Sequence, residues 1–259
     1  MGKIFDALER YKKEKSIETD GLFIGGPEKL IEDVTKSPSD LQSTVHSHVE
    51  KAFEVSSAPG FSGSENFKIL RNKLLYPKDG HKRRAILITS AFEGEGKTFV
   101  AANLGVSIAR GVDEYALLVD CDFHHPNLHS RLGYSNNEGL YEYLVGKRQL
   151  SDVIIRTKVE KLSLLPAGNF DANASDLLSS PLMKKLLGLV KGRNENRFII
   201  IDGPPSELLT ETTALANFIE GIIFVVRAQK SPREEIRKSI KNLGKKKILG
   251  IVFNGYYQM

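Results

Sequence analysis

From about residue 63 onward, the apolar positions of the chain alternate between short continuous runs and stripes at helical spacing. Six runs have the length and composition of strands, at residues 84–89, 115–120, 162–165, 197–201, 221–226 and 248–252. Helical patterns lie between most of them, at residues 97–110, 174–191, 208–218 and 232–244. Strands that are apolar on both faces and separated by helices are typical of a parallel sheet covered on both sides. We therefore predict a doubly wound, mostly parallel α/β domain over residues 63–259.

The first part of the chain has a different pattern. Residues 1–15 carry apolar side chains at helical spacing, which predicts an amphipathic N-terminal helix. This helix would pack on its own domain, on a neighbouring subunit or on a membrane surface. Periodicity is then lost, and Ser, Pro and Gly gather, so residues 16–62 are predicted to be a flexible linker. The domain thus carries a helical N-terminal arm.

The first predicted strand of the domain runs into AFEGEGKT, residues 91–98, and then into a helical stripe. This is the spacing of a phosphate-binding loop, or P-loop, with Ala91 where glycine is usual. Glycines let the backbone turn tightly so that successive N–H groups face a polyphosphate, and the helix N-terminus adds partial positive charge. Lys97 should reach the outer phosphates, and Thr98 should bind Mg²⁺. The predicted nucleotide-binding residues of this segment are Glu93, Gly94, Glu95, Gly96, Lys97, Thr98 and Phe99.

Two later strands end in carboxylates. FIIIDGPP delivers Asp202 to the carboxyl edge of the sheet, where it would hold Mg²⁺ together with Thr98. ALLVDCD ends in Asp120 and Asp122. Transfer of a phosphoryl group to a hydroxyl needs a carboxylate near the acceptor, so we expect Asp120 to act as the base, with a share in the metal, and Asp122 to assist. The alternative, a solvated loop and a helix cap, suits Asp122 better than Asp120.

A P-loop followed by LLVDCDFHHPNLH and IIIDGPP resembles the bacterial tyrosine kinases of capsule and exopolysaccharide synthesis. The resemblance covers residues 63–255 and implies ATP and Mg²⁺ as cofactors. The wider class includes cell-division and partitioning ATPases, which carry a second lysine early in the P-loop. Phe92 stands in that place here and favours the kinase branch. By analogy with those ATPases, Asn254 would contact adenine, although an Asn-Gly turn is an equal alternative.

The same resemblance bears on assembly and on the phosphate acceptor. SENFKILRNKL matches the family's oligomerisation helix, with Glu65, Lys68 and Arg71 at its three charged positions and lysine replacing the first arginine. Family members that autophosphorylate end in a tyrosine cluster. Only Tyr256 and Tyr257 follow the last predicted strand here, as candidate acceptors in a short free tail or as aromatic residues folded on the sheet edge. His124 stands where the family usually has arginine.

Composition adds little to this picture. The net charge of +5 is mild and spread out, so nucleic acid is not expected as a partner. No apolar run has membrane-spanning length, and no secretion signal opens the chain. We expect a cytoplasmic homo-oligomer, peripheral at the inner face of the membrane, where a membrane co-polymerase implied by the resemblance recruits or activates it.

Together these observations predict a Mg-ATP-dependent protein-tyrosine autokinase that regulates exopolysaccharide biosynthesis or export. The alternative is a switch ATPase without kinase activity, whose nucleotide state controls assembly at the membrane. His124 and the short tail favour that alternative.

Overall fold

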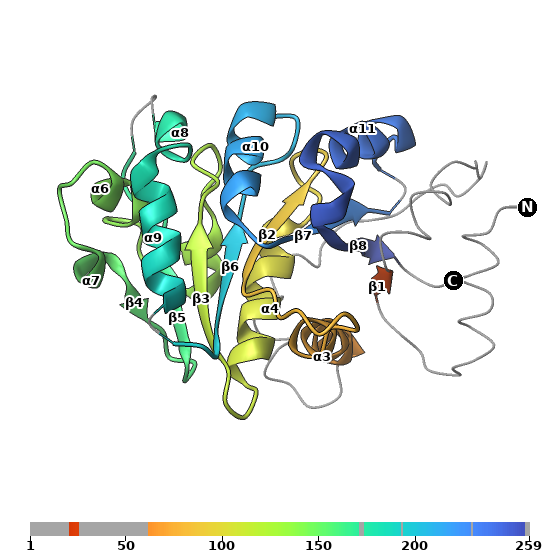
Figure 1. Cartoon of the computed structure of the whole chain (residues 1–259), viewed down its shortest axis with the longest axis horizontal. Helices are drawn as coiled ribbons and strands as arrows, with labels where there is room; N and C mark the ends of the chain where they lie inside the picture. Colours follow the sequence, from red (N-terminus) through yellow and green to blue (C-terminus); the bar gives the residue numbers. More distant parts are fainter. Residues whose placement is uncertain (1–20, 26–61, 171–173, 193, 229, 257–259) are drawn as a thin grey trace, which may run out of the picture.

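The computed structural model describes residues 21–25, 62–170, 174–192, 194–228 and 230–256. The predicted N-terminal helix at residues 1–15 lies outside the described residues. Within them, eight strands form one sheet in the order β1-β8-β7-β2-β6-β3-β5-β4 (Figure 1). Their bounds are β1 Gly21–Gly25, β2 Ala85–Ser90, β3 Tyr115–Asp120, β4 Ile155–Arg156, β5 Leu162–Leu165, β6 Arg197–Asp202, β7 Gly221–Arg227 and β8 Ile248–Tyr256.

The sheet is parallel from β8 through to β5, and only the edge strands β1 and β4 are antiparallel. Successive side chains of a strand point to opposite faces. Along β2, Leu87 belongs to one apolar cluster, whereas Ile86 and Ile88 belong to the cluster on the other face. Both faces of the sheet are therefore buried against apolar side chains. This explains the continuous apolar runs and confirms the doubly wound sheet.

Helices cover both faces of this sheet (Figure 1). On one face pack α3 Ser62–Leu75, α4 Lys97–Ala109 and α5 Leu128–Leu132. The other face carries α9 Pro181–Gly192, α10 Leu209–Phe218 and α11 Arg233–Leu243. Short elements complete the described chain: α6 Leu140–Leu144, α7 Leu150–Val153, α8 Ala174–Leu177 and the 3₁₀ turn η1 Lys245–Lys247. No helix in these ranges is long and apolar enough to cross a membrane.

The structure departs from the sequence prediction in several places, and α6, α7 and β4 were not predicted. The predicted helix over 174–191 is two helices, α8 and α9, and Pro181 begins the second because its fixed φ suits a first helical position. Five residues of the predicted linker form β1, so the linker prediction is wrong for Gly21–Gly25. Strand β8 runs on to Tyr256, beyond the predicted end at residue 252, because β7 pairs with it as far as Asn254 and β1 as far as Tyr256.

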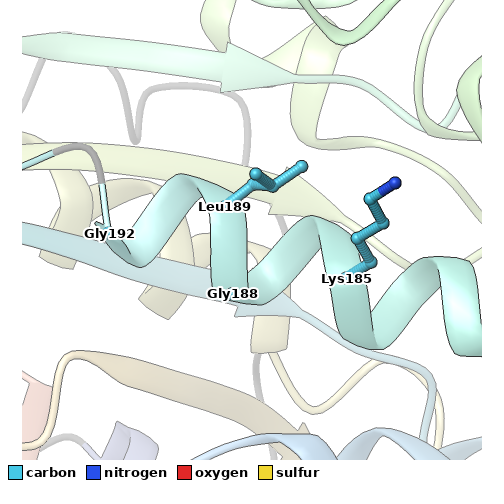
Figure 2. Close-up of a pocket in the computed structure, with 4 residues that line it drawn as sticks. All are labelled: Lys185, Gly188, Leu189 and Gly192. Carbon is cyan, nitrogen blue, oxygen red and sulfur yellow. The ribbon is translucent and has the colours of Figure 1, made fainter.

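Close packing of α4 on β3 depends on one glycine. A Cβ on Gly105 would lie 2.8 Å from Cδ2 of Leu118, a fully buried side chain. By contrast, Gly188 lies on the outer side of α9, between Lys185 and Leu189 (Figure 2), where an added Cβ meets nothing within 4 Å. The two helical glycines therefore face opposite packing constraints.

Exchange of each glycine for alanine should separate these constraints. We expect Gly105→Ala to lower the free energy of unfolding by about 1–3 kcal/mol, because the added methyl overpacks the core. Gly188→Ala should raise it by about 0.5–1 kcal/mol, since alanine is the better helix former. Urea unfolding followed by circular dichroism measures both. Equal effects of the two substitutions would contradict the close packing of α4 on β3.

Candidate active site

The P-loop connects the end of β2 to the start of α4, as the sequence predicted. Gly94 and Gly96 have φ of +74° and +97°, in the left-handed region that favours glycine. A Cβ on Gly96 would also lie 1.9 Å from Nδ2 of Asn254. Both conformation and space therefore require glycine at position 96.

The two aspartate strands meet beside this loop. β3 and β6 are neighbours in the sheet, and their register pairs Asp120 with Asp202. Lys97, the first residue of α4, is 5% exposed, and Asp122 is 3% exposed, with 3.7 Å between the lysine Nζ and the aspartate Oδ2. The structure thus brings the predicted catalytic residues Lys97, Asp120 and Asp122 and the predicted metal ligand Asp202 into one buried cluster.

Asp120 holds the backbone that follows it. Its Oδ1 accepts a hydrogen bond from the Asp122 N–H at 3.2 Å, and its Oδ2 accepts one from the Leu128 N–H at 3.0 Å, at the start of α5. Of the two aspartates, Asp122 was expected to suit the helix cap better, but the contact with α5 belongs to Asp120. Asp122 instead accepts from the His125 N–H at 3.1 Å within its own turn.

The charges of this cluster are poorly compensated. Burial, the neighbouring Asp202 and, more weakly, Asp122 raise the pKa of Asp120 well above its usual range. Burial likewise raises the pKa of Asp202 to about 7, although the Thr98 hydroxyl and the Lys97 charge act in the opposite direction. Neither carboxylate oxygen of Asp202 has a hydrogen-bond partner of normal geometry among the described residues. The positive charge near the end of β6 therefore does not offset the burial of the Asp202 carboxylate.

This deficit fits a magnesium ion. Thr98, Asp120 and Asp202 offer the oxygen atoms that Mg²⁺ prefers. In the described ranges no group of three or more His, Cys, Asp or Glu side chains could enclose a metal by itself. An ion that takes most of its ligands from phosphates and water does not need such a cage.

Sequence reasoning missed one cation of this site. Arg131, on α5, is half-buried, and its charge lowers the pKa of Asp202. Its Nε is buried without a hydrogen-bond partner among the described residues. The only signal in the sequence was a basic residue shortly after the second aspartate. His124, which stands in the place of the family arginine, instead contacts Glu211 of α10 at 2.8 Å between Nε2 and Oε1.

Several of the predicted nucleotide-binding residues contact other parts of the protein. The Asn254 amide donates to the Glu95 carbonyl at 2.9 Å, so its side chain lies against the P-loop. Phe99 packs edge-to-face on Phe67 of α3, with 5.8 Å between ring centroids. Glu93 is exposed, and its Oε1 lies 3.6 Å from Nδ1 of His125.

The three charged residues of α3 divide into two groups. Glu65 and Lys68 pair with each other at 2.5 Å, and their side chains are 64% and 50% exposed. Arg71 instead donates to the Ser107 carbonyl of α4 at 3.0 Å. Arg71 thus anchors α3 to its own domain, whereas Glu65 and Lys68 are accessible on the surface.

The two candidate acceptor tyrosines do not form a free pair. Tyr256 is the last residue of β8, and its backbone pairs with Gly21 of β1. The prediction that it lies in a free tail is therefore wrong. Tyr257 lies outside the described residues.

Comparison with known proteins agrees with this geometry. The AAA domain family matches residues 83–246. Tyrosine-protein kinase CpsD of Streptococcus agalactiae is 30% identical over 193 residues, which cover 73% of this chain and 81% of CpsD. The chain belongs to the family of bacterial tyrosine-protein kinases. Another relative, EpsB of Ralstonia nicotianae, is 31% identical over 218 residues, 83% of this chain, but the match spans only 29% of EpsB.

Solved structures give the same assignment. The kinase domain of Escherichia coli tyrosine kinase ETK superposes with a TM-score of 0.73 at 25% identity, over 95% of this chain and 96% of that one. The chimerical protein CapA2B2 gives 0.74 at 29% identity, over 80% and 91%. MinD of Pyrococcus horikoshii, a septum site-determining protein complexed with Mg-ADP, gives 0.54 at 30% identity, over 65% and 67%. The chain thus has the fold of these kinase domains, and the family resemblance seen in the sequence is confirmed.

The Asp202 carboxylate should destabilise the protein when no metal is bound. Its pKa in the folded state, about 7, lies above its ordinary value of 3.8, so the folded state binds more protons between these pH values, and stability falls as pH rises through them. We expect Asp202→Asn in EDTA to raise the free energy of unfolding by about 1–3 kcal/mol at pH 8, with the gain shrinking toward pH 5.

Denaturant unfolding at both pH values measures this effect. The control is Asp113→Asn, which removes an exposed carboxylate and should leave the pH dependence unchanged. A gain in the free energy of unfolding that is the same at pH 5 and pH 8 would show that the pKa of Asp202 is not raised in the folded protein.

Proposed function

We propose that this chain is a Mg-ATP-dependent tyrosine autokinase that regulates exopolysaccharide synthesis or export together with a membrane co-polymerase. The observation that carries the proposal is the buried pair of Asp120 and Asp202 beside Lys97. One aspartate suffices to hold a metal for nucleotide hydrolysis. A second buried carboxylate of raised pKa on the neighbouring strand supplies a base for an acceptor hydroxyl.

The roles of the residues follow from their positions. The P-loop amides and the N-terminus of α4 bind the phosphates of ATP, and Lys97 turns from Asp122 toward the outer phosphates. Mg²⁺, held by Thr98, Asp202 and Asp120, would neutralise phosphate charge. Asp120 accepts the proton of the tyrosine hydroxyl as its oxygen bonds to the γ-phosphorus and ADP leaves, and Asp122 assists by its charge. Arg131 adds positive charge beside Asp202.

Acceptor use has a structural consequence. The proposed acceptors are Tyr256 and Tyr257 of an adjacent subunit. Gly255 has φ of +71°, and the β1–β8 register shifts at this point, between Gly21 and Leu22. The end of β8 can therefore leave the sheet at a glycine, while Asn254 stays on its own P-loop. Tyr256 must leave its pairing with β1 before it can enter a neighbouring active site.

The second candidate is a switch ATPase without kinase activity. Two observations favour it: the backbone of Tyr256 is held in the sheet, and His124 contacts Glu211 on α10. In that case nucleotide binding and hydrolysis would control assembly at the membrane. Both candidates share the nucleotide site and differ in the fate of the γ-phosphoryl group.

Incubation of the purified chain with Mg-ATP, with and without the membrane partner, should yield phosphotyrosine that mass spectrometry places on Tyr256 and Tyr257. Lys97→Met should abolish the signal, because it removes the charge on the outer phosphates. Asp120→Asn should reduce the rate by about 10²–10⁴-fold through loss of the base. Phenylalanine at both tyrosines should remove most of the product.

The matched control is Lys185→Met, which changes an exposed lysine on α9 (Figure 2) and should leave phosphorylation unchanged. Hydrolysis of ATP without any modified tyrosine, in both conditions, would sink the kinase proposal in favour of the switch ATPase.

We further propose that the protein assembles through α3. The exposed Glu65–Lys68 pair supplies charges that a neighbouring copy can bind, whereas Arg71 is already committed to Ser107. A lysine gives one point charge rather than the bidentate contact of arginine, so the interface should be salt-sensitive. The membrane co-polymerase would then bring the subunits together at the inner face of the membrane.

Charge removal on α3 tests this assembly. A Glu65→Ala/Lys68→Ala double variant should shift the protein toward monomer in multi-angle light scattering at low salt, with an unchanged circular dichroism spectrum. Lys185→Ala, which removes a lysine on the opposite face of the sheet, is the control. Arg71→Ala is unsuitable, because loss of its bond to α4 destabilises the fold. An unchanged mass for the double variant would refute the role of α3.

A further inference from the structure

Glu95, in the middle of the P-loop, is buried although it carries a charge. Only 1% of the residue is exposed, and the carboxylate forms hydrogen bonds inside the protein. Its Oε2 accepts from the Phe92 N–H at 3.0 Å, and its Oε1 accepts from the Arg227 N–H at 3.4 Å. The Ser231 hydroxyl also donates to Oε1. The side chain is therefore fully engaged with protein donors and is not available to a nucleotide.

These bonds join the P-loop to another part of the sheet. Arg227 ends β7, and Ser231 lies just before α11. Two more contacts run the same way: Arg227 Nη1 donates to the Gly94 carbonyl at 3.2 Å, and the Asn254 amide of β8 donates to the Glu95 carbonyl at 2.9 Å. Carbonyls and a carboxylate of the loop thus accept these bonds, and none of the bonds uses a backbone N–H of residues 94–98.

Burial raises the pKa of the Glu95 carboxyl, but the hydrogen bonds that it accepts act in the opposite direction, and an acid fits this position better than its amide. Three donors converge on the carboxylate, which has acceptor capacity on both oxygens. A glutamine in the same place offers one oxygen and one NH₂ group. In either orientation its NH₂ group faces a backbone N–H, of Phe92 or of Arg227, and that buried donor loses its partner.

We infer that Glu95 is a positioning residue for nucleotide binding, which holds the P-loop in its phosphate-binding shape by tying it to Arg227 and Ser231. The carboxylate touches neither phosphate nor acceptor in this role. Loss of the tie lets the loop leave the conformation in which its amides converge, and nucleotide must then select that conformation from others. Affinity for the phosphates falls, whereas the chemical step, once nucleotide is bound, proceeds as before.

The inference rests on nucleotide binding by the loop and not on any tyrosine acceptor, so its test is a binding measurement. Titration of the full chain with fluorescent N-methylanthraniloyl-ADP and Mg²⁺ gives the Kd. Glu95→Gln should raise this Kd by about tenfold, the effect of one buried donor left without a partner. In turnover assays with ATP the same variant should raise KM by a similar factor and leave kcat within about twofold.

Ser231 provides an independent variant on the other side of the tie. Ser231→Ala should raise the Kd by about threefold, since one hydrogen bond to a charged group is lost, and Ser231→Thr, which keeps the hydroxyl, should restore it. The double variant Glu95→Gln/Ser231→Ala should bind no worse than Glu95→Gln alone, because both changes break the same network.

The control is Glu234→Gln, an isosteric change of an exposed acid on α11 whose carboxylate pairs only with Arg237 in the described structure. Its Kd should equal that of the unchanged protein. A folded Glu95→Gln or Ser231→Ala protein with a Kd within about twofold of the original would overturn the inference, even if its melting temperature fell. If Glu95→Gln does not fold, the Kd values of Ser231→Ala and Ser231→Thr test the inference instead. Failure of tyrosine phosphorylation with intact ADP binding would sink the proposed function and leave this inference standing.

Discussion

The site depends on an electrostatic constraint: Asp120 and Asp202 end adjacent parallel strands in register, and both are buried. Burial raises the pKa of both carboxyls, and a neighbouring carboxylate raises each further, Asp202 in the case of Asp120 and Asp122 in the case of Asp202. The two carboxylates stay buried because both faces of the sheet are covered and the sheet holds the two strand ends in place. Bound Mg²⁺ and nucleotide would reduce the cost of burying these carboxylates. The site should therefore be more stable with its ligands than without them.

The P-loop is tied to β7, to β8 and to the residue before α11. Its glycines allow left-handed backbone conformations, but glycine alone also makes a loop mobile. Contacts from Arg227, Ser231 and Asn254 restrict that freedom without occupying the ligand side. The buried Glu95 thus differs from the buried Asp120 and Asp202. Protein donors satisfy the Glu95 carboxylate, whereas the charges of the two aspartates are not fully compensated by the protein.

The edge of the sheet links the ends of the described chain. β1 pairs with the last residues of β8, and α3 contacts β1 (Figure 1). One strand therefore lies between the proposed assembly helix and Tyr256, the proposed acceptor. Assembly through α3 and release of the tyrosine end from β1 would act on neighbouring elements, which offers a physical route from oligomer state to acceptor supply.

Local pattern in the sequence determined most of the fold and the core of the site. The strand runs, the P-loop and the carboxylates at the strand ends follow from periodicity and spacing, because each is specified within a few residues of chain. Strand β1 was missed because a five-residue strand depends on its pairing partner. That partner, the end of β8 as far as Tyr256, is more than two hundred residues away. The extension of β8 was missed for the same reason.

Only tertiary structure decided which side chains meet. Sequence could not show that Arg131 approaches Asp202, that His124 pairs with Glu211, or that Asn254 supports the P-loop, since these contacts join elements far apart in the chain. The same holds for Glu95. The sequence places this residue in the P-loop, but only the packing of β7 and α11 beside the loop shows that its carboxylate bonds to them. Motif spacing fixes the backbone of a site, and the packing of strands and helices selects the partners of its charges.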